Sequence, residues 1–472
     1  MEGKKLGALM VFAFTCFLFY IILISSASGL LKFGIVLVLM AGCGISLQAL
    51  LKIDGQFGIL LLRTQSGLHY IDDIANFSPR LWNACADFGI VLGFGLSSAI
   101  FFKKYKSGFP VKTFMFSMIV LLAVSQVMTI KVFQMIVLLI NVPMDVTSLS
   151  EQMGTAISFV PIIIFAAMLE FGLCGVTVAG LVLNTYSILA TLFSVLLSSG
   201  AKLSDAMPGA SPIIPGINMP LAEGLIALGI LLFIHELSHG ILSRIGKVKL
   251  ESAGLLLYGI IPVGAFIDPN ENTLLKKSIE VQTRVFAAGS ASNIILFIIV
   301  FFLLTGFEYV AASYQDPGVY LVSVEPGSPA SEAGISAGDK LVSVEGTAVT
   351  WNNLGQLSVL LGKSDKVTVK TDKGSYLIQP KLSGDRKYLG VRLPPQPRFI
   401  TGFEWLGFIK NTLGLILVLN FLVGVINLVP LFMAFDGYRI LTINVQNQLL
   451  IKGISYSLFA MFLLNFLPWL WS

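Results

Sequence analysis

The chain has 472 residues, of which 55% are hydrophobic and only 12% are charged, whereas soluble domains average about a quarter charged residues. This composition excludes an ordinary soluble enzyme and predicts a polytopic helical membrane protein with room for one small soluble domain. The net charge of +5 is small and scattered along the chain, so we expect no nucleic acid among its partners.

Apolar stretches of about 20 residues, the length that crosses the hydrocarbon core of a bilayer, recur along the chain. We therefore predict an all-α, multi-pass integral protein of the cell membrane, with lipid as its main surroundings. The expected spans number about ten, at residues 7–27, 31–51, 87–103, 112–141, 157–174, 178–199, 221–243, 289–308, 404–432 and 449–470.

Residues 1–205 form the predicted N-terminal transmembrane region. Within it, the segment 52–86 mixes charges with short apolar runs, which is typical of a hairpin or an amphipathic helix lying on the membrane surface. The segment contains His69, one of three histidines in the chain. A histidine in such a loop is more often a surface side chain than a metal ligand.

The other two histidines lie four residues apart near the end of the stretch 221–243, in the order His235, Glu236, Leu, Ser, His239. On an α-helix, residues i and i+4 share a face with Cβ atoms about 5–6 Å apart, so two imidazoles can reach one Zn²⁺. Glu236 then stands beside the metal as a general base. The pattern also arises by chance in helices. However, ionisable residues inside a spanning helix cost about 2.5–3.5 kcal/mol each and are functional by default.

A zinc hydrolase needs a third protein ligand besides the two histidines. The candidates are Glu170 within a span, His69 in the interfacial segment, and Asp436 at the end of an apolar stretch. Asp436 is favoured because it directly follows the apolar stretch 404–432 and is predicted to lie on the same side of the membrane as the histidines.

Residues 206–316 and 394–472 form the two parts of the predicted catalytic membrane core. The apolar run GLLLYGIIPVGAFIDP at 254–269 fits either a short span or a membrane-associated strand region. A strand with a free edge would let an extended substrate pair with its backbone.

Between these two parts, residues 317–393 change abruptly to alternating β-branched and polar residues, the pattern of half-buried strands. The run GSPASEAGISAGDKLVSVEG at 327–346 is similar to the common PDZ pattern, with Gly338 and Asp339 in the turn before a strand. We therefore expect a small β-rich PDZ-like domain inserted in the helical protein, which either captures peptides or blocks the access of bulky substrates.

Together these features resemble the site-2 protease family of intramembrane zinc metalloproteases, in its PDZ-containing branch. HELSHG at 235–240 is similar to the first family motif, and NLVPLFMAFDG at 427–437 to the second, with five residues rather than four between Pro and Asp. AAGSASN at 287–293 is similar to the Gly-x-x-x-Asn motif, and GINMP at 216–220 resembles archaeal members.

The resemblance implies a zinc endopeptidase that cleaves transmembrane protein substrates within or near the bilayer. Residue by residue, it implies Zn²⁺ ligands at His235, His239 and Asp436, a catalytic base at Glu236, and substrate-binding residues at Asn293 and Asn427. From the residues alone, an asparagine at membrane depth either clamps a substrate backbone or ties two helices together by hydrogen bonds.

Positive charge in the short loops sets the expected orientation. The basic loops 103–112, 244–285 and 433–452 are predicted to be cytoplasmic, which places the active site near the cytoplasmic side and the PDZ-like domain outside. This scheme leaves Lys4 and Lys5 outside.

The sequence is also compatible with two functions of other classes. A non-catalytic membrane scaffold would use the PDZ-like domain as its working part. A secondary transporter would also have about ten spans, but it should show a repeat-related pair of broken helices, and the HELSH segment has no second copy in the sequence.

Overall fold

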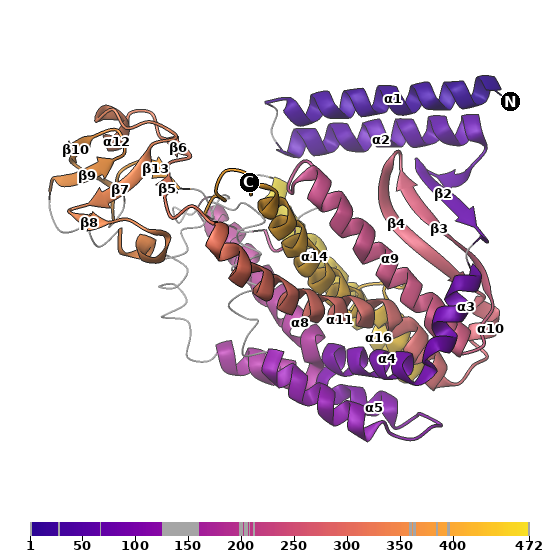
Figure 1. Ribbon diagram of the computed structural model, residues 1–472. Coiled ribbons are helices and arrows are strands. Elements are labelled where there is room, and N and C mark those ends of the chain that lie inside the picture. Colours follow the sequence, from indigo (N-terminus) through magenta and orange to yellow (C-terminus); the bar gives the residue numbers. More distant parts are fainter. Residues whose placement is uncertain are drawn as a thin grey trace. The chain divides into compact units, whose positions relative to one another are not determined.

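A computed structural model gives the fold of the chain (Figure 1). Most of its long helices are apolar. The described residues form two compact units, Met1–Phe302 with Thr412–Ser472, and Leu303–Asn411. The structure describes residues 2–26, 29–66, 68–124, 160–197, 202, 206, 208–210, 213–357, 361, 365–383, 386–393 and 397–470.

Eight helices among the described residues are long and apolar enough to cross a membrane. A helix suits this environment because it satisfies its backbone N–H and C=O groups internally, where no water is present to do so. They are α1 (Glu2–Ile24), α2 (Gly29–Leu51), α4 (Pro79–Phe94) with its continuation α5 (Ser98–Phe102), α8 (Val160–Leu196), α9 (Leu221–Ile245), α11 (Ile279–Ala311), α14 (Trp405–Leu428) and α16 (Gln448–Phe466).

The stretch predicted as two spans, 157–174 and 178–199, has a break in its described part but no loop at that break. Its described part, α8, consists of two helical segments that meet at a kink at Gly172, where φ is 61° and ψ is −151°. A Cβ at Gly172 would lie 2.5 Å from backbone atoms of Gly93 on α4. The helix therefore bends where two glycine backbones meet, and it continues without a loop.

The predicted span 112–141 is only partly described. Its beginning forms a shorter apolar helix, Val111–Val124, and its remaining residues lie outside the described ones, as does the predicted outer loop 142–156.

A four-stranded antiparallel sheet joins two segments that are far apart in the chain. The strands are β1 (Asp54–Gln56), β2 (Ile59–Thr64), β3 (Leu250–Tyr258) and β4 (Ile261–Pro269), in that order across the sheet. The segment 52–86 thus contains both a hairpin and a helix, α3 (Leu68–Phe77). The run 254–269 forms strands and does not form a short span.

The two hairpin turns of this sheet dock on α2, which lies beside their tips in Figure 1. Gly58 and Gly259 occupy these turns with φ of 84° and 61°, the left-handed region that favours glycine. A Cβ on Gly58 would lie 2.7 Å from the backbone of Ala41, and one on Gly259 would lie 2.7 Å from the Met40 carbonyl oxygen. At its other edge, β4 packs along α9.

The face of α11 that packs against its neighbours consists of small residues. Ala287, Ala288 and Ala291 are at most 2% exposed. A Cβ at Gly89 of α4 would lie 2.1 Å from the Cβ of Ala291, so the two helices are in direct backbone contact. Small residues allow this close approach, which larger side chains would prevent.

The second unit has its own apolar core, built by Val319, Leu341, Val344, Val367 and Val369. Its main sheet has the order β10–β9–β7–β5, with β8 paired to β7, and short strands flank it. The elements are β5 (Val319–Tyr320), β6 (Ser323–Val324), α12 (Pro329–Glu332), β7 (Lys340–Val344), β8 (Thr347–Ala348), β9 (Val367–Thr371), β10 (Ser375–Ile378), β11 (Lys381–Ser383), β12 (Arg386–Tyr388) and β13 (Val391–Arg392).

Candidate metal centre

Helix α9 presents both histidines of the HELSH sequence on one face. The Nε2 atoms of His235 and His239 lie 3.3 Å apart, and the imidazole rings face each other edge to face. His235 is buried, with 8% of its surface exposed. The i, i+4 spacing therefore produces the paired imidazoles that the sequence predicts.

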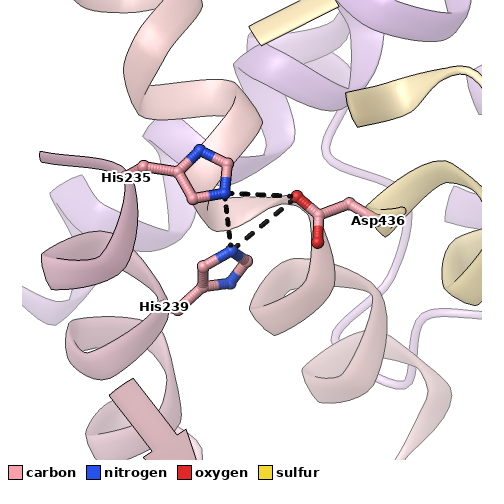
Figure 2. Close-up of side chains that lie close together, drawn as sticks. All are labelled: His235, His239 and Asp436. Carbon is pink, nitrogen blue, oxygen red and sulfur yellow. Dashed lines mark hydrogen bonds and ion pairs between the residues drawn. The ribbon is translucent and has the colours of Figure 1, made fainter. Parts of the chain in front are cut away.

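Asp436 reaches the same point from a different part of the chain. It begins the short helix α15 (Asp436–Asn444), which follows the turn after α14. Gly437 makes this turn possible, because a Cβ there would lie 1.8 Å from the Leu428 carbonyl oxygen. Figure 2 shows the Asp436 carboxylate opposite the two rings, with Oδ2 at 3.8 Å from His235 Nε2 and 3.7 Å from His239 Nε2.

The spacing of these three donor atoms fits a zinc ion. Tetrahedral bonds of 2.0–2.1 Å to zinc place the donor atoms about 3.4 Å apart, and the observed separations are 3.3–3.8 Å. Two imidazoles and one carboxylate also form a common zinc donor set that leaves one position for water. The cluster is thus a candidate metal centre on both geometry and chemistry.

His239 is held in the tautomer that metal binding requires. Its Nδ1 lies 2.7 Å from the Val285 carbonyl oxygen on α11, which accepts a hydrogen bond from the Nδ1–H. Because the proton is on Nδ1, Nε2 carries the free lone pair.

Asn293 contacts the other histidine. It is fully buried, its Nδ2 lies 3.1 Å from His235 Nδ1, and its Oδ1 is buried without a partner. Exchanging the two ends of the amide lets Oδ1 accept a hydrogen bond from the His235 Nδ1–H. This arrangement gives the amide oxygen a donor and leaves His235 Nε2 free for a metal. The structure therefore places Asn293 of α11 against His235 of α9, a contact that fits the second role expected of an asparagine at membrane depth, a tie between two helices.

Ser290 supports the third member of the cluster, and the sequence analysis missed it. Its hydroxyl is completely buried and donates a hydrogen bond of 3.1 Å to Asp436 Oδ2. Its position one residue after Gly289, inside the segment 287–293, was the available signal.

Gly289 lies directly against the imidazoles. A Cβ at this position would lie 2.4 Å from His235 Nε2 and 2.5 Å from His239 Nε2. Only a glycine leaves this space open, so α11 can approach the donor atoms as closely as it does.

Glu236 points from α9 toward the sheet. Its Oε2 accepts a hydrogen bond of 2.9 Å from the backbone N–H of Ile267 on β4. This contact fixes the carboxylate next to the two histidines. It also shows that the free edge of β4 faces the helix that carries the site.

The remaining candidates lie elsewhere. Asn427 is half-buried near the end of α14, next to the Leu428 carbonyl that contacts Gly437. His69 is exposed on α3, and Glu170 is exposed on α8, where its carbonyl oxygen accepts a hydrogen bond from Ser97. Neither His69 nor Glu170 belongs to the three-residue cluster.

The residues of this site lie in a part of the chain that matches a known protein family. The sequence model of peptidase family M50 matches residues 223–466, which include every member of the cluster. An uncharacterized protein of Methanocaldococcus jannaschii is 26% identical over 260 residues, covering 53% of this chain and 65% of that protein.

Two bacterial proteins whose names include the words zinc metalloprotease also match. One from Clostridium perfringens is 24% identical over 39% of this chain and 63% of its own length. One from Clostridium acetobutylicum is 27% identical over 37% of this chain and 58% of its own length. The chain thus spans less than two thirds of the length of these relatives.

The close approach at Gly289 gives a direct test of the centre. Gly289→Ala should lower the zinc affinity of the purified protein by about 10- to 100-fold, the range found when the surroundings of metal ligands are disturbed. Competition with a chelator measures this affinity. Gly306→Ala on the same helix is the control, because a Cβ there meets nothing within 4 Å. Equal zinc affinities of the Gly289→Ala variant and the wild type would contradict the assignment.

Proposed function

Because the chain belongs to peptidase family M50, we propose that it is a membrane-embedded zinc metalloprotease that hydrolyses peptide bonds of membrane-spanning proteins. The observation that carries this proposal is the meeting of His235, His239 and Asp436 within 3.3–3.8 Å in a bundle of apolar helices. Ionisable residues at membrane depth are costly, and their convergence here is best explained by a metal.

In this proposal, His235, His239 and Asp436 hold the zinc ion. Bound zinc supplies a Lewis acid that activates a water molecule and polarises the scissile carbonyl group. Glu236 takes a proton from the attacking water and delivers it to the leaving amine. The hydrogen bond from the Ile267 N–H keeps the Glu236 carboxylate oriented for this transfer.

Glu236→Gln should abolish this proton transfer and leave every ligand in place. We expect one zinc per chain, as in the wild type, and a cleavage rate lowered by about 10²- to 10⁴-fold. Zinc analysis, together with cleavage of a transmembrane peptide in detergent, checks both values. Glu223→Gln, in the first turn of the same helix, is the matched control and should cleave normally. A Glu236→Gln variant with the wild-type rate would overturn the mechanism.

The free edge of β4 supports an extended conformation of the substrate. A transmembrane helix hides its peptide bonds in internal hydrogen bonds, so it must unwind before hydrolysis. β4 is the last strand of its sheet, and the Ile267 N–H on its free edge points toward Glu236. We propose that the unwound stretch of substrate pairs with this edge by strand addition.

Ala265 lies two residues before Ile267, so its N–H belongs to the same free edge. Ala265→Pro removes this donor without breaking a bond to β3. It should therefore keep zinc bound and raise the KM for a transmembrane substrate by about tenfold, equivalent to one hydrogen bond of roughly 1.4 kcal/mol. Ala265→Val keeps the N–H and is the control. An unchanged KM in the Ala265→Pro variant would exclude strand addition at this edge.

The second unit supports the proposal of an inserted PDZ-like domain. Its β7 follows the turn at Gly338 and Asp339, as the sequence predicts for the PDZ pattern. Asp339 accepts a hydrogen bond from the Ser336 N–H at 3.0 Å and is paired with Lys373, which holds the pKa of Asp339 below its usual range. We propose that this domain selects substrates, since no member of the metal centre belongs to it.

Contacts among the basic loops support the proposed orientation. Lys104 donates a hydrogen bond to the Asn444 carbonyl oxygen, and Ser107 bonds to Glu280. The three basic segments thus meet at one end of the first unit. By the positive-inside rule, we propose that this end is cytoplasmic, so the chain that follows the single crossing of α11 is extracytoplasmic.

Cysteine labelling in intact cells tests this orientation in a background without the four native cysteines. Both positions are exposed in the structure, so labelling depends on the side of the membrane on which each lies. Lys276→Cys should be protected from a membrane-impermeant maleimide, whereas Glu332→Cys should react. The reverse pattern would place the active site near the outer side.

A further inference from the structure

An ion pair at the start of α11 links the metal centre to the N-terminal region, which the family match does not cover. We propose that Asp87 is a positioning residue for the metal centre. Through Arg284 it fixes α11 in the register at which the Val285 carbonyl holds His239. The inference rests on the proposed function, because the effect of this positioning is measured as zinc binding and proteolysis.

The ion pair between Asp87 and Arg284 is bidentate and nearly buried. Arg284 Nε lies 2.9 Å from Asp87 Oδ1, and Nη2 lies 2.8 Å from Oδ2. The side chains are 13% and 3% exposed for Arg284 and Asp87. Two parallel hydrogen bonds to a planar guanidinium fix both distance and direction, which a single contact would not.

Neighbouring groups complete this network. Arg284 Nη1 donates to Glu280 Oε1 at 2.6 Å, and Ser107 donates to the same carboxylate. The Tyr105 hydroxyl lies 3.3 Å from Asp87 Oδ1, and its ring faces the guanidinium. Every charged group in the network therefore has partners, so the pair can remain ionised in a buried position.

The network acts on the part of α11 that contacts the ligands. Arg284 directly precedes Val285, whose carbonyl accepts the His239 Nδ1–H at 2.7 Å. Further along the helix, Gly89, two residues after Asp87, meets Ala291 in backbone contact. Helix α4 thus contacts α11 at Arg284 and at Ala291, on either side of Gly289 and Ser290, which face the imidazoles and Asp436.

Two further ion pairs join the same N-terminal stretch to elements of the site. Arg63 on β2 pairs with Asp268 on β4 at 3.0 Å, next to the residue that bonds Glu236. Asp72 on α3 pairs with Arg244 on α9 at 2.9 Å. Both are more exposed than the pair of Asp87 and Arg284, and exposed pairs contribute little. The buried pair is therefore the one that we expect to fix the site.

In the full-length protein, the test replaces both charges of the bidentate pair at once, by Asp87→Leu with Arg284→Met, so that neither partner of this pair stays buried alone. Glu280 loses Arg284 but keeps its two hydrogen bonds from Ser107. At a temperature where wild type and variant are both folded, we expect zinc affinity and kcat to fall by about 10- to 100-fold. The KM for a transmembrane peptide should be unchanged, because the pair is almost fully buried. A polar tie between α8 and α16, removed by Asn184→Leu with Asn465→Leu, is the control.

A purely structural pair gives a different result. It would lower the unfolding temperature of the zinc-free protein and leave zinc affinity and kcat of the folded protein unchanged, and that outcome overturns the inference. If the double variant does not fold, Asp87→Glu replaces it, since this change keeps the charge and displaces the carboxylate by one methylene. It should lower zinc affinity at least about threefold, and an unchanged affinity again overturns the inference. A wild type that binds no zinc would instead contradict the proposed function.

Discussion

The imidazoles of His235 and His239 and the carboxylate of Asp436 lie together inside a bundle of apolar helices. The packing of the first unit makes this close approach possible. Buried polar groups without partners are costly in such a setting. Accordingly, His239 bonds to the Val285 carbonyl, His235 contacts Asn293, and Asp436 accepts from Ser290. The two Nε2 atoms have no such partner, and they point at each other and at the Asp436 Oδ2 that also accepts from Ser290. This is the arrangement expected of groups that share a cation.

All three supporting groups come from a single helix, α11. This explains why residues 287–292 of α11 are glycine, alanine and serine, since small residues let the helix approach α4 at Ala291 and the histidines of α9 at Gly289. It also means that a small shift of α11 along its axis would disturb three ligands together. The buried pair of Asp87 and Arg284 acts at this point. The N-terminal region thus positions the helix that supports the metal centre, although this region lies outside the family match.

Local patterns in the sequence predicted the features that depend on short spacings. The four-residue interval between His235 and His239 is a property of one helix, and the family resemblance is confirmed by the match to peptidase family M50. The pairing of β2 with β3 could not be predicted, because Arg63 and Gly254 are paired across nearly two hundred residues. A window of sequence contains no signal for such a register.

The sequence alone also does not identify the buried residues that form hydrogen bonds with the members of the cluster. The sequence assigns no role to Ser290, because its hydrogen bond to Asp436 depends on where α15 begins. For Asn293 the sequence leaves two roles open, binding a substrate backbone or tying two helices together, and its contact with His235 links α11 to α9. The break predicted near residue 175 lies at Gly172, where two helical segments meet at a kink and glycine backbones are in contact, without a loop.

X-ray absorption spectroscopy at the zinc edge tests the central claim most directly. Purified wild-type protein should bind one zinc, with two imidazole nitrogens at about 2.0–2.1 Å and one carboxylate oxygen at about 2.0–2.2 Å among its ligands. Asp436→Asn should lose the carboxylate contribution and bind zinc more weakly. Sulfur ligands at about 2.3 Å, or an unchanged spectrum in Asp436→Asn, would contradict the proposed centre.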